Sequence, residues 1–307
     1  MERSFILRLY EMGERNFAGA DLRGANLSGA TLIGVNLSRA NLTGANLSRA
    51  FLTKSNLTGA FLNWANLSFV KMSEGQLENA DLTKVDLSGS FLVKSNLRKA
   101  KLSGAILAGA NLRAANLEKA NLCGANLESI NLRGANLMGA NLNWANLCGA
   151  RLSGAIIYGA FLNNVNLAGA FLNGVDLNGV DLNGVNLSDA KLNGANLQAA
   201  NLAATNFSKA QLKGVSLAGS NLTGADLSRA TLCNAKLDWA NLSKTDFTKA
   251  DLRATHLLGV KIEGAEFTDA SMSESTRRYL STIAIGANPW SHRETLTTLN
   301  TSLASNR

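Results

Sequence analysis

A large apolar residue returns at every fifth position between residues 16 and 270, as at Phe17, Leu22 and Leu27. The residue two places before it is nearly always small, and the other three positions are mostly polar. A helix repeats its apolar residues with a period near 3.6 and a strand with a period of two, so neither explains this spacing. The 255 residues form 51 uninterrupted units of five. They predict a repeat architecture instead of ordinary globular packing.

Each unit predicts a short strand followed by a tight turn. Ala20 and Leu22 are two residues apart, so this piece of chain alternates inward and outward like a strand. The three residues before the next small position leave room for a turn, and a Gly such as Gly24 suits a turn with unusual dihedral angles. Repeating strand and turn wraps the chain around a narrow core and places a thin parallel sheet on each side.

Units such as NLSGA at residues 26–30, which read A(N/D)LxG when the frame is shifted by one residue, resemble the pentapeptide-repeat family. The resemblance covers about five-sixths of the chain. It implies an all-β solenoid, a right-handed quadrilateral parallel β-helix with four pentapeptides per coil and about 13 coils. The residues around Leu9, Tyr10 and Gly13 are similar to the segment that precedes the repeats in cyanobacterial members of this family.

We expect short helical caps at both ends of the repeats. Residues 1–15 are predicted as an N-terminal cap, 16–275 as the β-helix and 276–307 as a C-terminal cap. Apolar residues at helical spacing across residues 3–12, with Gly13 as a stop, predict the first helix. Such a helix would cover the apolar end of the first coil.

The C-terminal segment predicts a second helix. Ser291 and Glu294 have the spacing of a capping box, and Leu296, Leu299 and Leu303 follow on one face. That helix either covers the last coil or pairs with another molecule, so a monomer and a dimer through an end cap both remain open.

The units within residues 66–95 depart most from the repeat, with Met72, Gly75 and Glu78 close together. Because the register is kept, we expect a softer or wider coil there and no projecting loop. In coils of 20 residues, positions n and n+20 are neighbours in register. Glu78, Arg98 and Glu118 therefore form one column with alternating charge.

One column of exposed positions is the predicted protein-binding face. Phe side chains alternate with Lys and Arg in it, which is typical of interfaces. Structural tolerance is the competing explanation, because Phe61 and Phe161 occupy the same slot on another side. The residues of the predicted face are Phe51, Lys71, Phe91, Arg151, Phe171 and Lys191.

The net charge of +8 is unevenly distributed. Residues 16–150 contain 13 Lys or Arg against 7 Asp or Glu, and residues 151–275 contain 10 against 11. A nucleic-acid-binding or nucleic-acid-competing rod is therefore the alternative function, with affinity that falls steeply with salt. The residues of the basic patch lie on different sides of the coil, and no aromatic side chains alternate with them to form a platform. We therefore do not expect a nucleic-acid partner. Its residues are Lys94, Arg98, Lys99, Lys101, Arg113, Lys119 and Arg133.

The sequence contains no signal for a catalytic, cofactor-binding or metal site. His256 and His292 lack the spaced partners that a triad or a metal site needs. Cys123, Cys148 and Cys233 fall on three different sides, so neither a disulfide nor a shared metal is expected. Free thiols, the lack of a signal peptide and the lack of a long apolar run predict a cytoplasmic protein without membrane contact.

We therefore predict a non-enzymatic scaffold whose rigid surface binds a protein partner, with a regulatory role. Some members of the family that this sequence resembles shield DNA gyrase with an acidic, DNA-like surface and projecting loops. The basic N-terminal half and the unbroken register argue against that role. A mainly structural protein without a dedicated partner is the third hypothesis, and the sequence does not identify a partner.

Overall fold

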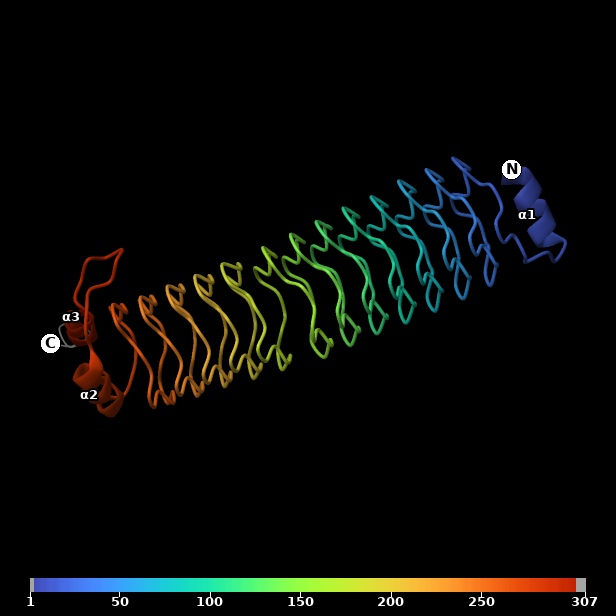
Figure 1. Cartoon of the computed structure of the whole chain (residues 1–307). Helices are drawn as coiled ribbons and strands as arrows, with labels where there is room; N and C mark the ends of the chain where they lie inside the picture. Colours follow the sequence, from blue (N-terminus) through green and yellow to red (C-terminus); the bar gives the residue numbers. More distant parts are fainter. Residues whose placement is uncertain (1–2, 302–307) are drawn as a thin grey trace. The chain divides into compact units, whose positions relative to one another are not determined.

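The computed structural model describes residues 3–301. The chain forms two compact units, Met1–Val165 (unit 1) and Asn166–Arg307 (unit 2). In both units the chain winds into successive coils, blue to green in unit 1 and yellow to red in unit 2 (Figure 1). The predicted period of five therefore produces coiled chain in each unit.

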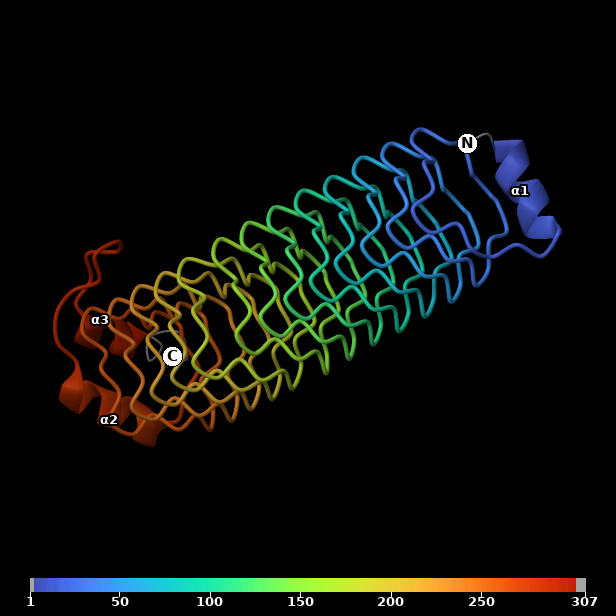
Figure 2. The same ribbon diagram turned by 45° about the vertical axis from the view of Figure 1, so that its right-hand side comes forward.

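Parallel bridges between residues 20 positions apart hold the coils of each unit together. In unit 1, Asn36 pairs with Asn56 and Asn41 pairs with Phe61. Bridge residues recur every five positions, so four of them complete one coil before the chain lies beside itself again. Figure 2 shows these coils following one another. The coil of four pentapeptides is thus confirmed within each unit, with single bridges in place of extended strands.

In the unit Asn41–Ala45 every backbone N–H finds an acceptor. The first, second and fourth residues donate to carbonyls of the adjacent coils at 2.9, 2.7 and 2.9 Å. The N–H of Ala45 closes a turn on the carbonyl of Leu42 at 2.9 Å. The N–H of Thr43 donates to Oδ1 of Asn41 at 3.2 Å. A repeat with Asn at the bridge position can therefore satisfy all of its backbone N–H groups, which lets coils of this kind follow one another.

The Asn and Asp residues at the bridge position have two roles. We expected ladders between coils, and Nδ2 of Asn36 does donate to Oδ1 of Asn16 at 2.8 Å. More often the side-chain oxygen accepts the N–H two residues ahead, which is an Asx turn. The bond from the N–H of Ser48 to Oδ1 of Asn46, 3.0 Å long, is an example. The second role explains why a short side chain with an oxygen is preferred at this position.

The residue three positions after each bridge residue, which is the fourth residue of the repeat, adopts a positive φ. Gly24 has a φ of 62°, as expected for glycine, but Lys84 and Trp239 have φ of 56° and 63° at the same position. The turn is closed by a bond between residues three apart, the geometry of a type II turn. The sequence predicted unusual dihedral angles at the glycines of the turns. It did not indicate that many larger residues adopt the same conformation.

The core is a stack of the predicted Leu residues with a layer of small residues between them. Leu42 and Ala45 are both completely buried, and so is Ile130, the one bulky residue at a small position. In unit 2 the rings of Phe247 and Phe267 stack with centroids 5.2 Å apart. Each coil therefore relies on the coil before and after it for its apolar contacts.

Helix α1 (Arg3–Glu11) confirms the predicted N-terminal helix and crosses the first coil of unit 1 (Figure 1). Its Ile6 is 1% exposed, and the hydroxyl of Tyr10 donates to the carbonyl of Ile33 at 3.1 Å. The guanidinium of Arg15 lies 3.7 Å from the centre of the Tyr10 ring. These contacts fix the helix over the open end of the coil.

Two helices occupy the C-terminal end of unit 2: α2 (Glu274–Ile283) and α3 (Thr295–Asn300). Helix α2 was not predicted, although Ser273 caps it by accepting the N–H of Thr276 at 3.0 Å. The polar Ser-Glu start of this helix is the signal that the sequence offered.

The predicted capping box is wrong. Helix α3 begins at Thr295 with Glu294 as an N-cap that makes no side-chain cap bond. The hydroxyl of Ser291 donates to Glu266 of the last coils instead. Leu299 is buried and Leu296 is 46% exposed, while Leu303 lies outside the described residues.

The irregular units around Met72 keep their place in the stack, as predicted. Lys71 bridges both Phe51 and Phe91. A Cβ added to Gly75 would lie 2.6 Å from Cγ of Met72, so the longer Met side chain fills the space that Gly75 leaves. None of the helices described here is long and apolar enough to span a membrane.

Candidate protein-interaction face

Three residues of the predicted face form consecutive bridges in unit 1. Phe51 pairs with Lys71, which pairs with Phe91. The two rings are 37% and 47% exposed. Nζ of Lys71 lies 4.7 Å from the centre of the Phe51 ring, a cation–π contact. The pattern read from the sequence therefore produces a continuous strip of exposed aromatic and cationic side chains.

Arg151 belongs to the same column of unit 1. The bridges continue from Phe91 through Asn111 and Asn131 to Arg151, which is exposed. The last two predicted residues lie in unit 2, where Phe171 and Lys191 pair with each other. Nζ of that lysine is 4.3 Å from the ring centre, and both residues are half-buried. The six predicted residues therefore form two groups, one in each unit.

The structure adds part of the basic patch to the strip in unit 1. Arg113 and Arg133 follow a core Leu, so they project outward on the same side as the bridge residues two positions before them. The N–H of Lys94 donates to the carbonyl of Arg113 at 3.0 Å, which places the lysine at the adjacent turn. We call this surface of unit 1 the basic face: Phe51, Lys54, Lys71, Phe91, Lys94, Arg113, Arg133 and Arg151.

The other four residues of the patch lie on different sides, and Arg98, Lys101 and Lys119 among them are engaged with carboxylates. Nη1 of Arg98 is 2.8 Å from Glu78, and its Nε is 3.5 Å from Glu118, as the predicted column required. Lys119 approaches the same Glu118 at 3.8 Å. Lys101, on a third side, is 3.8 Å from Asp81, and Lys99 lies at a turn beside Arg98. The seven predicted residues thus do not form one surface.

The cations of the basic face are free of such neutralisation. Among the residues described, neither Arg113 nor Arg133 nor Arg151 forms an ion pair, and the same holds for Lys71 and Lys94. Arg113 and Arg133 are neighbours in one column, about 4.8 Å apart in backbone spacing. Two adjacent guanidinium groups without a carboxylate favour contact with an anion.

The side chains of the exposed Phe residues do not make the turn-closing hydrogen bond that Asn makes at the same position. Asn at the bridge position accepts the N–H two residues ahead, as Asn56 does for Thr58 at 3.0 Å. A phenyl ring at Phe51 or Phe91 cannot provide that acceptor. These positions therefore give up a hydrogen bond that most repeats make, and they place an apolar ring in water.

One interaction that the sequence did not reveal involves a cysteine of unit 2. Sγ of Cys233 donates to Oδ2 of Asp251 at 2.9 Å. The hydrogen bond to this carboxylate, with partial burial and its negative charge, raises the pKa of the Cys233 thiol. The two positions are 18 residues apart, so the register of 20 could have placed them in adjacent coils. Cys123 and Cys148 are free and half-buried.

Metal-binding side chains are not clustered in the described part of the chain. No group of three or more His, Cys, Asp or Glu residues there could hold a metal ion. His256 projects from a repeat and His292 from the segment before α3, and both are exposed.

Comparison with known proteins places the sequence in a family. The profile of the pentapeptide repeats matches in eight copies between residues 20 and 184, and that of the pentapeptide repeat region matches residues 195–267. No protein with curated annotation matches the chain.

Three solved structures illustrate the similarity. HetL, a pentapeptide repeat protein involved in heterocyst differentiation regulation from the cyanobacterium Nostoc sp. strain PCC 7120, is 33% identical over 89% of this chain and 98% of its own, with a TM-score of 0.33. A pentapeptide repeat protein from the Arabidopsis thaliana thylakoid lumen is 35% identical over 42% and 91% of the two chains, with a TM-score of 0.28. Rfr23 from the cyanobacterium Cyanothece 51142 is 29% identical over 51% and 94%, with a TM-score of 0.19. The repeats at residues 20–184 and 195–267 show that this chain belongs to the pentapeptide-repeat family.

Proposed function

We propose that this protein is a non-enzymatic scaffold that binds a protein partner through the basic face of unit 1. The proposal includes the finer architecture, a right-handed quadrilateral β-helix across residues 16–275 whose ends are closed by caps at 1–15 and 276–307. It also includes a cytoplasmic location, which suits three cysteines that form no disulfide. The proposal also gives the scaffold a regulatory role, exercised through binding.

The observation that carries the proposal is the coincidence of exposed rings and unpaired cations on one side of one unit. Phe51 and Phe91 supply apolar contact area, and Ile33, 46% exposed, follows a core Leu in the same column as Arg113. Aromatic and Arg residues are enriched at the energetic centres of interfaces. The partner that fits is an acidic protein surface with apolar side chains among its carboxylates.

Charge on the other sides of unit 1 supports this choice of face. Arg23, Arg98 and Lys101 on those sides are each paired with a carboxylate. On the basic face six Lys or Arg residues are accompanied by one acid, Glu74. Electrostatic attraction to an acidic partner would therefore be directed at this face and would raise the rate of association.

The experiment is a pull-down from the source lysate with the full chain as bait. The first test variant carries Phe51→Ser and Phe91→Ser, and the second carries Arg113→Glu and Arg133→Glu. Phe61→Ser is the matched control, because Phe61 occupies the same bridge position on another side and is 49% exposed. Circular dichroism and thermal melting verify that each bait is folded.

The proposal predicts one acidic protein that wild type and the Phe61→Ser control retain and both test variants lose. Retention of that protein by all folded baits would show that the basic face is not the interface. Phe171→Ser, tested separately, reports whether the pair in unit 2 contributes. Nuclease treatment and a salt series distinguish nucleic acid, because binding to phosphates weakens steeply with salt and would be abolished by the nuclease.

A further inference from the structure

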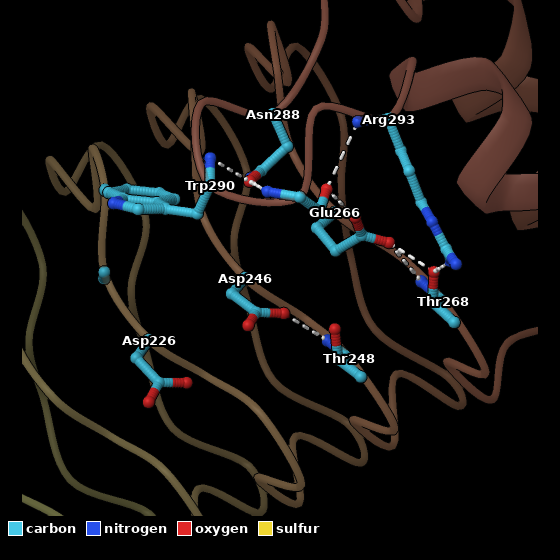
Figure 3. A pocket seen from close by; sticks show the side chains of 11 residues that line it. Asp226, Asp246, Thr248, Glu266, Thr268, Asn288, Trp290 and Arg293 are labelled. Carbon is cyan, nitrogen blue, oxygen red and sulfur yellow. Dashed lines mark hydrogen bonds between the residues drawn. The ribbon is translucent and has the colours of Figure 1, made fainter.

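A pocket of roughly 380 Å³ lies in unit 2, where the segment before α3 folds back over the last coils. Three successive bridge residues, Asp226, Asp246 and Glu266, form one wall (Figure 3). Trp290 and Arg293 come from the returning segment and border the same space. The volume is within the range of sites that hold small ligands or one large side chain.

The returning segment is a short hairpin fastened to the coil. Ala287 and Glu294 form an antiparallel bridge. Nδ2 of Asn288, a residue 2% exposed, donates to the carbonyl of Gly264 at 3.0 Å. Its Oδ1 accepts the backbone N–H of Trp290 at 3.0 Å, so the same side chain fixes the tip of the hairpin. The position of Trp290 is therefore determined by buried contacts, not by its own packing.

The indole of Trp290 is left partly in water. It is 63% exposed, and the tip of its ring lies near Gly224, where an added Cβ would be 3.4 Å from Cη2. A large aromatic ring held over a pocket by a buried asparagine has one face available to a ligand. The quadrupole of an indole attracts cations to that face more strongly than any other side chain does.

Two carboxylates of the pocket have unused acceptor capacity. Oδ1 of Asp226 accepts the N–H of Ser228, and Oδ1 of Asp246 accepts the N–H of Thr248, both at 2.8 Å. Within residues 3–301 the second oxygen of each aspartate has no partner. The two residues bridge each other, so like charges face each other in adjacent coils, about 4.8 Å apart in backbone spacing.

The remaining charges of the pocket are already occupied. Glu266 is 4% exposed and accepts hydrogen bonds from the hydroxyls of Ser291 and Thr268. Nη1 of Arg293 donates to Oγ1 of Thr268 at 3.1 Å, which places one cation beside this buried carboxylate. The two free aspartate oxygens and the indole face are thus the parts of the pocket that remain open to a ligand.

We propose that this pocket binds the arginine side chain of a protein partner. A guanidinium group is planar, stacks on an indole and donates parallel hydrogen bonds to carboxylates. It would lie on Trp290 and reach the second oxygens of Asp226 and Asp246, and its charge would relieve their repulsion. A lysine ammonium would be attracted by the two carboxylates, but it could not stack on the indole and donate paired hydrogen bonds at the same time. The site belongs to unit 2 and does not depend on the basic face of unit 1.

The first experiment titrates the full chain with a blocked pentapeptide that contains one arginine, followed by the indole N–H signals in a nitrogen–proton correlation spectrum. Matched peptides carry lysine or citrulline, which keeps the shape of arginine and lacks its charge. Saturable shifts of the Trp290 signal with arginine, at least tenfold weaker binding of lysine, and no binding of citrulline are expected. Equal binding of citrulline, or no saturable shift with arginine, would overturn the proposal.

Variants locate the site. Asp226→Asn with Asp246→Asn should weaken arginine binding at least tenfold. Trp290→Ala should do the same, whereas Trp290→Phe keeps a ring and should retain part of the affinity, read out by the backbone signals of Thr248. Asp86→Asn is the matched control, since Asp86 holds the equivalent bridge position in unit 1 and accepts the N–H of Ser88. Unchanged affinity in the double variant, or an equal loss in the control, would contradict the assignment.

Two further arms identify the source of the arginine. Arg307→Gln removes the one arginine of this chain beyond residue 301, so unchanged peptide affinity and unchanged Trp290 signals in this variant support a partner as the source. A Trp290 signal that moves in this variant without added peptide would mean that the chain fills its own pocket. Blocked arginine amide, compared with the pentapeptide, separates the two free ligands: tighter binding of the peptide supports a protein segment, and equal or tighter binding of the amide contradicts it.

Discussion

The indole of Trp239 lies directly over the backbone of Gly259, which follows it by 20 residues in the next coil. A Cβ on Gly259 would fall 2.3 Å from Cε3 of the indole, closer than real contacts allow. The absence of a side chain at Gly259 is therefore what lets the large residue at position 239 lie flat on its neighbour.

Gly259→Ala should destabilise unit 2 by more than an ordinary Gly→Ala change. Gly259 has a φ of 67°, which costs an L-residue about 1–2 kcal/mol, and the methyl group would also displace the indole. Gly179→Ala is the control, because Gly179 has a φ of 65° and a Cβ there would contact nothing within 4 Å. Urea unfolding measures both. The extra loss at 259 should vanish in a Trp239→Ala background, and its persistence there would refute the packing explanation.

Ala204→Gly should increase stability, although glycine usually destabilises. Ala204 has a φ of 52°, so its methyl group is held in a strained conformation that glycine adopts freely. The strain of about 1–2 kcal/mol is partly offset by the larger entropy of an unfolded glycine, which leaves a net gain of about 0.5 kcal/mol. Ala203→Gly, one residue earlier, should destabilise. Thermal unfolding of the two variants should shift the midpoint in opposite directions, and equal shifts would argue against strain at the turn.

Asp251→Asn should make the thiol of Cys233 more reactive. The hydrogen bond to Asp251 raises the pKa of this thiol, so less thiolate is present at pH 8 than in a free cysteine. Removing the carboxylate charge should speed alkylation of Cys233 by iodoacetamide several-fold, as followed by mass spectrometry of its peptide. Asp246→Asn, in the same unit, is the control. A rate that does not change in Asp251→Asn would show that burial alone protects the thiol.

The same carboxylate should make stability depend on pH. The hydrogen bonds from Arg253, 2.9 and 2.7 Å long, hold the pKa of Asp251 well below its usual range, against the opposing effect of burial. A depressed pKa in the folded state stabilises the fold above the unfolded value of about 3.9, and this contribution disappears as pH falls through the folded value. Asp251→Asn should therefore be less stable than wild type at pH 7, and the difference should shrink below about pH 3.9. A difference that stays constant over this range would exclude the linkage.

Arg98→Ala should cost more than a typical surface substitution. Arg98 lies between Glu78 and Glu118, and each of the three side chains is about one-third exposed or less. Its removal leaves two carboxylates facing an empty position, a loss of stability that high salt should reduce. Arg133→Ala, which breaks no ion pair among the described residues, is the control. Urea unfolding at low and high salt tests both, and a loss independent of salt would point to packing instead.

The register was predictable because one number governs it. Once a coil has 20 residues, the neighbours of Arg98 follow by addition, and the ion pairs to Glu78 and Glu118 confirm that arithmetic. The strip of Phe51, Lys71 and Phe91 follows in the same way. Family membership was equally accessible, since the repeat is visible in the sequence itself.

The sequence was less informative where the repeat ends. Ser291 and Glu294 matched a local capping pattern, but the hydroxyl of Ser291 bonds Glu266, a residue 25 positions earlier. No period connects the hairpin before α3 to the coil, so the pocket beneath Trp290 could not be found by counting. The conformation of residues such as Lys84 at the turns was also hidden, because the bonds between coils impose a positive φ whatever the side chain.

The contact between Trp239 and Gly259 also has a direction. A Cβ on Gly259 would collide with the earlier Trp239, whereas one on Gly44 would meet nothing within 4 Å, although Trp64 follows it by the same 20 residues. Turn side chains thus lean toward the coil that comes after them. Anyone who inserts a coil therefore needs a small turn residue in it wherever the preceding coil carries a large one, and a small residue in the following coil wherever the inserted one is large, so the two ends of a transplanted coil obey different design rules.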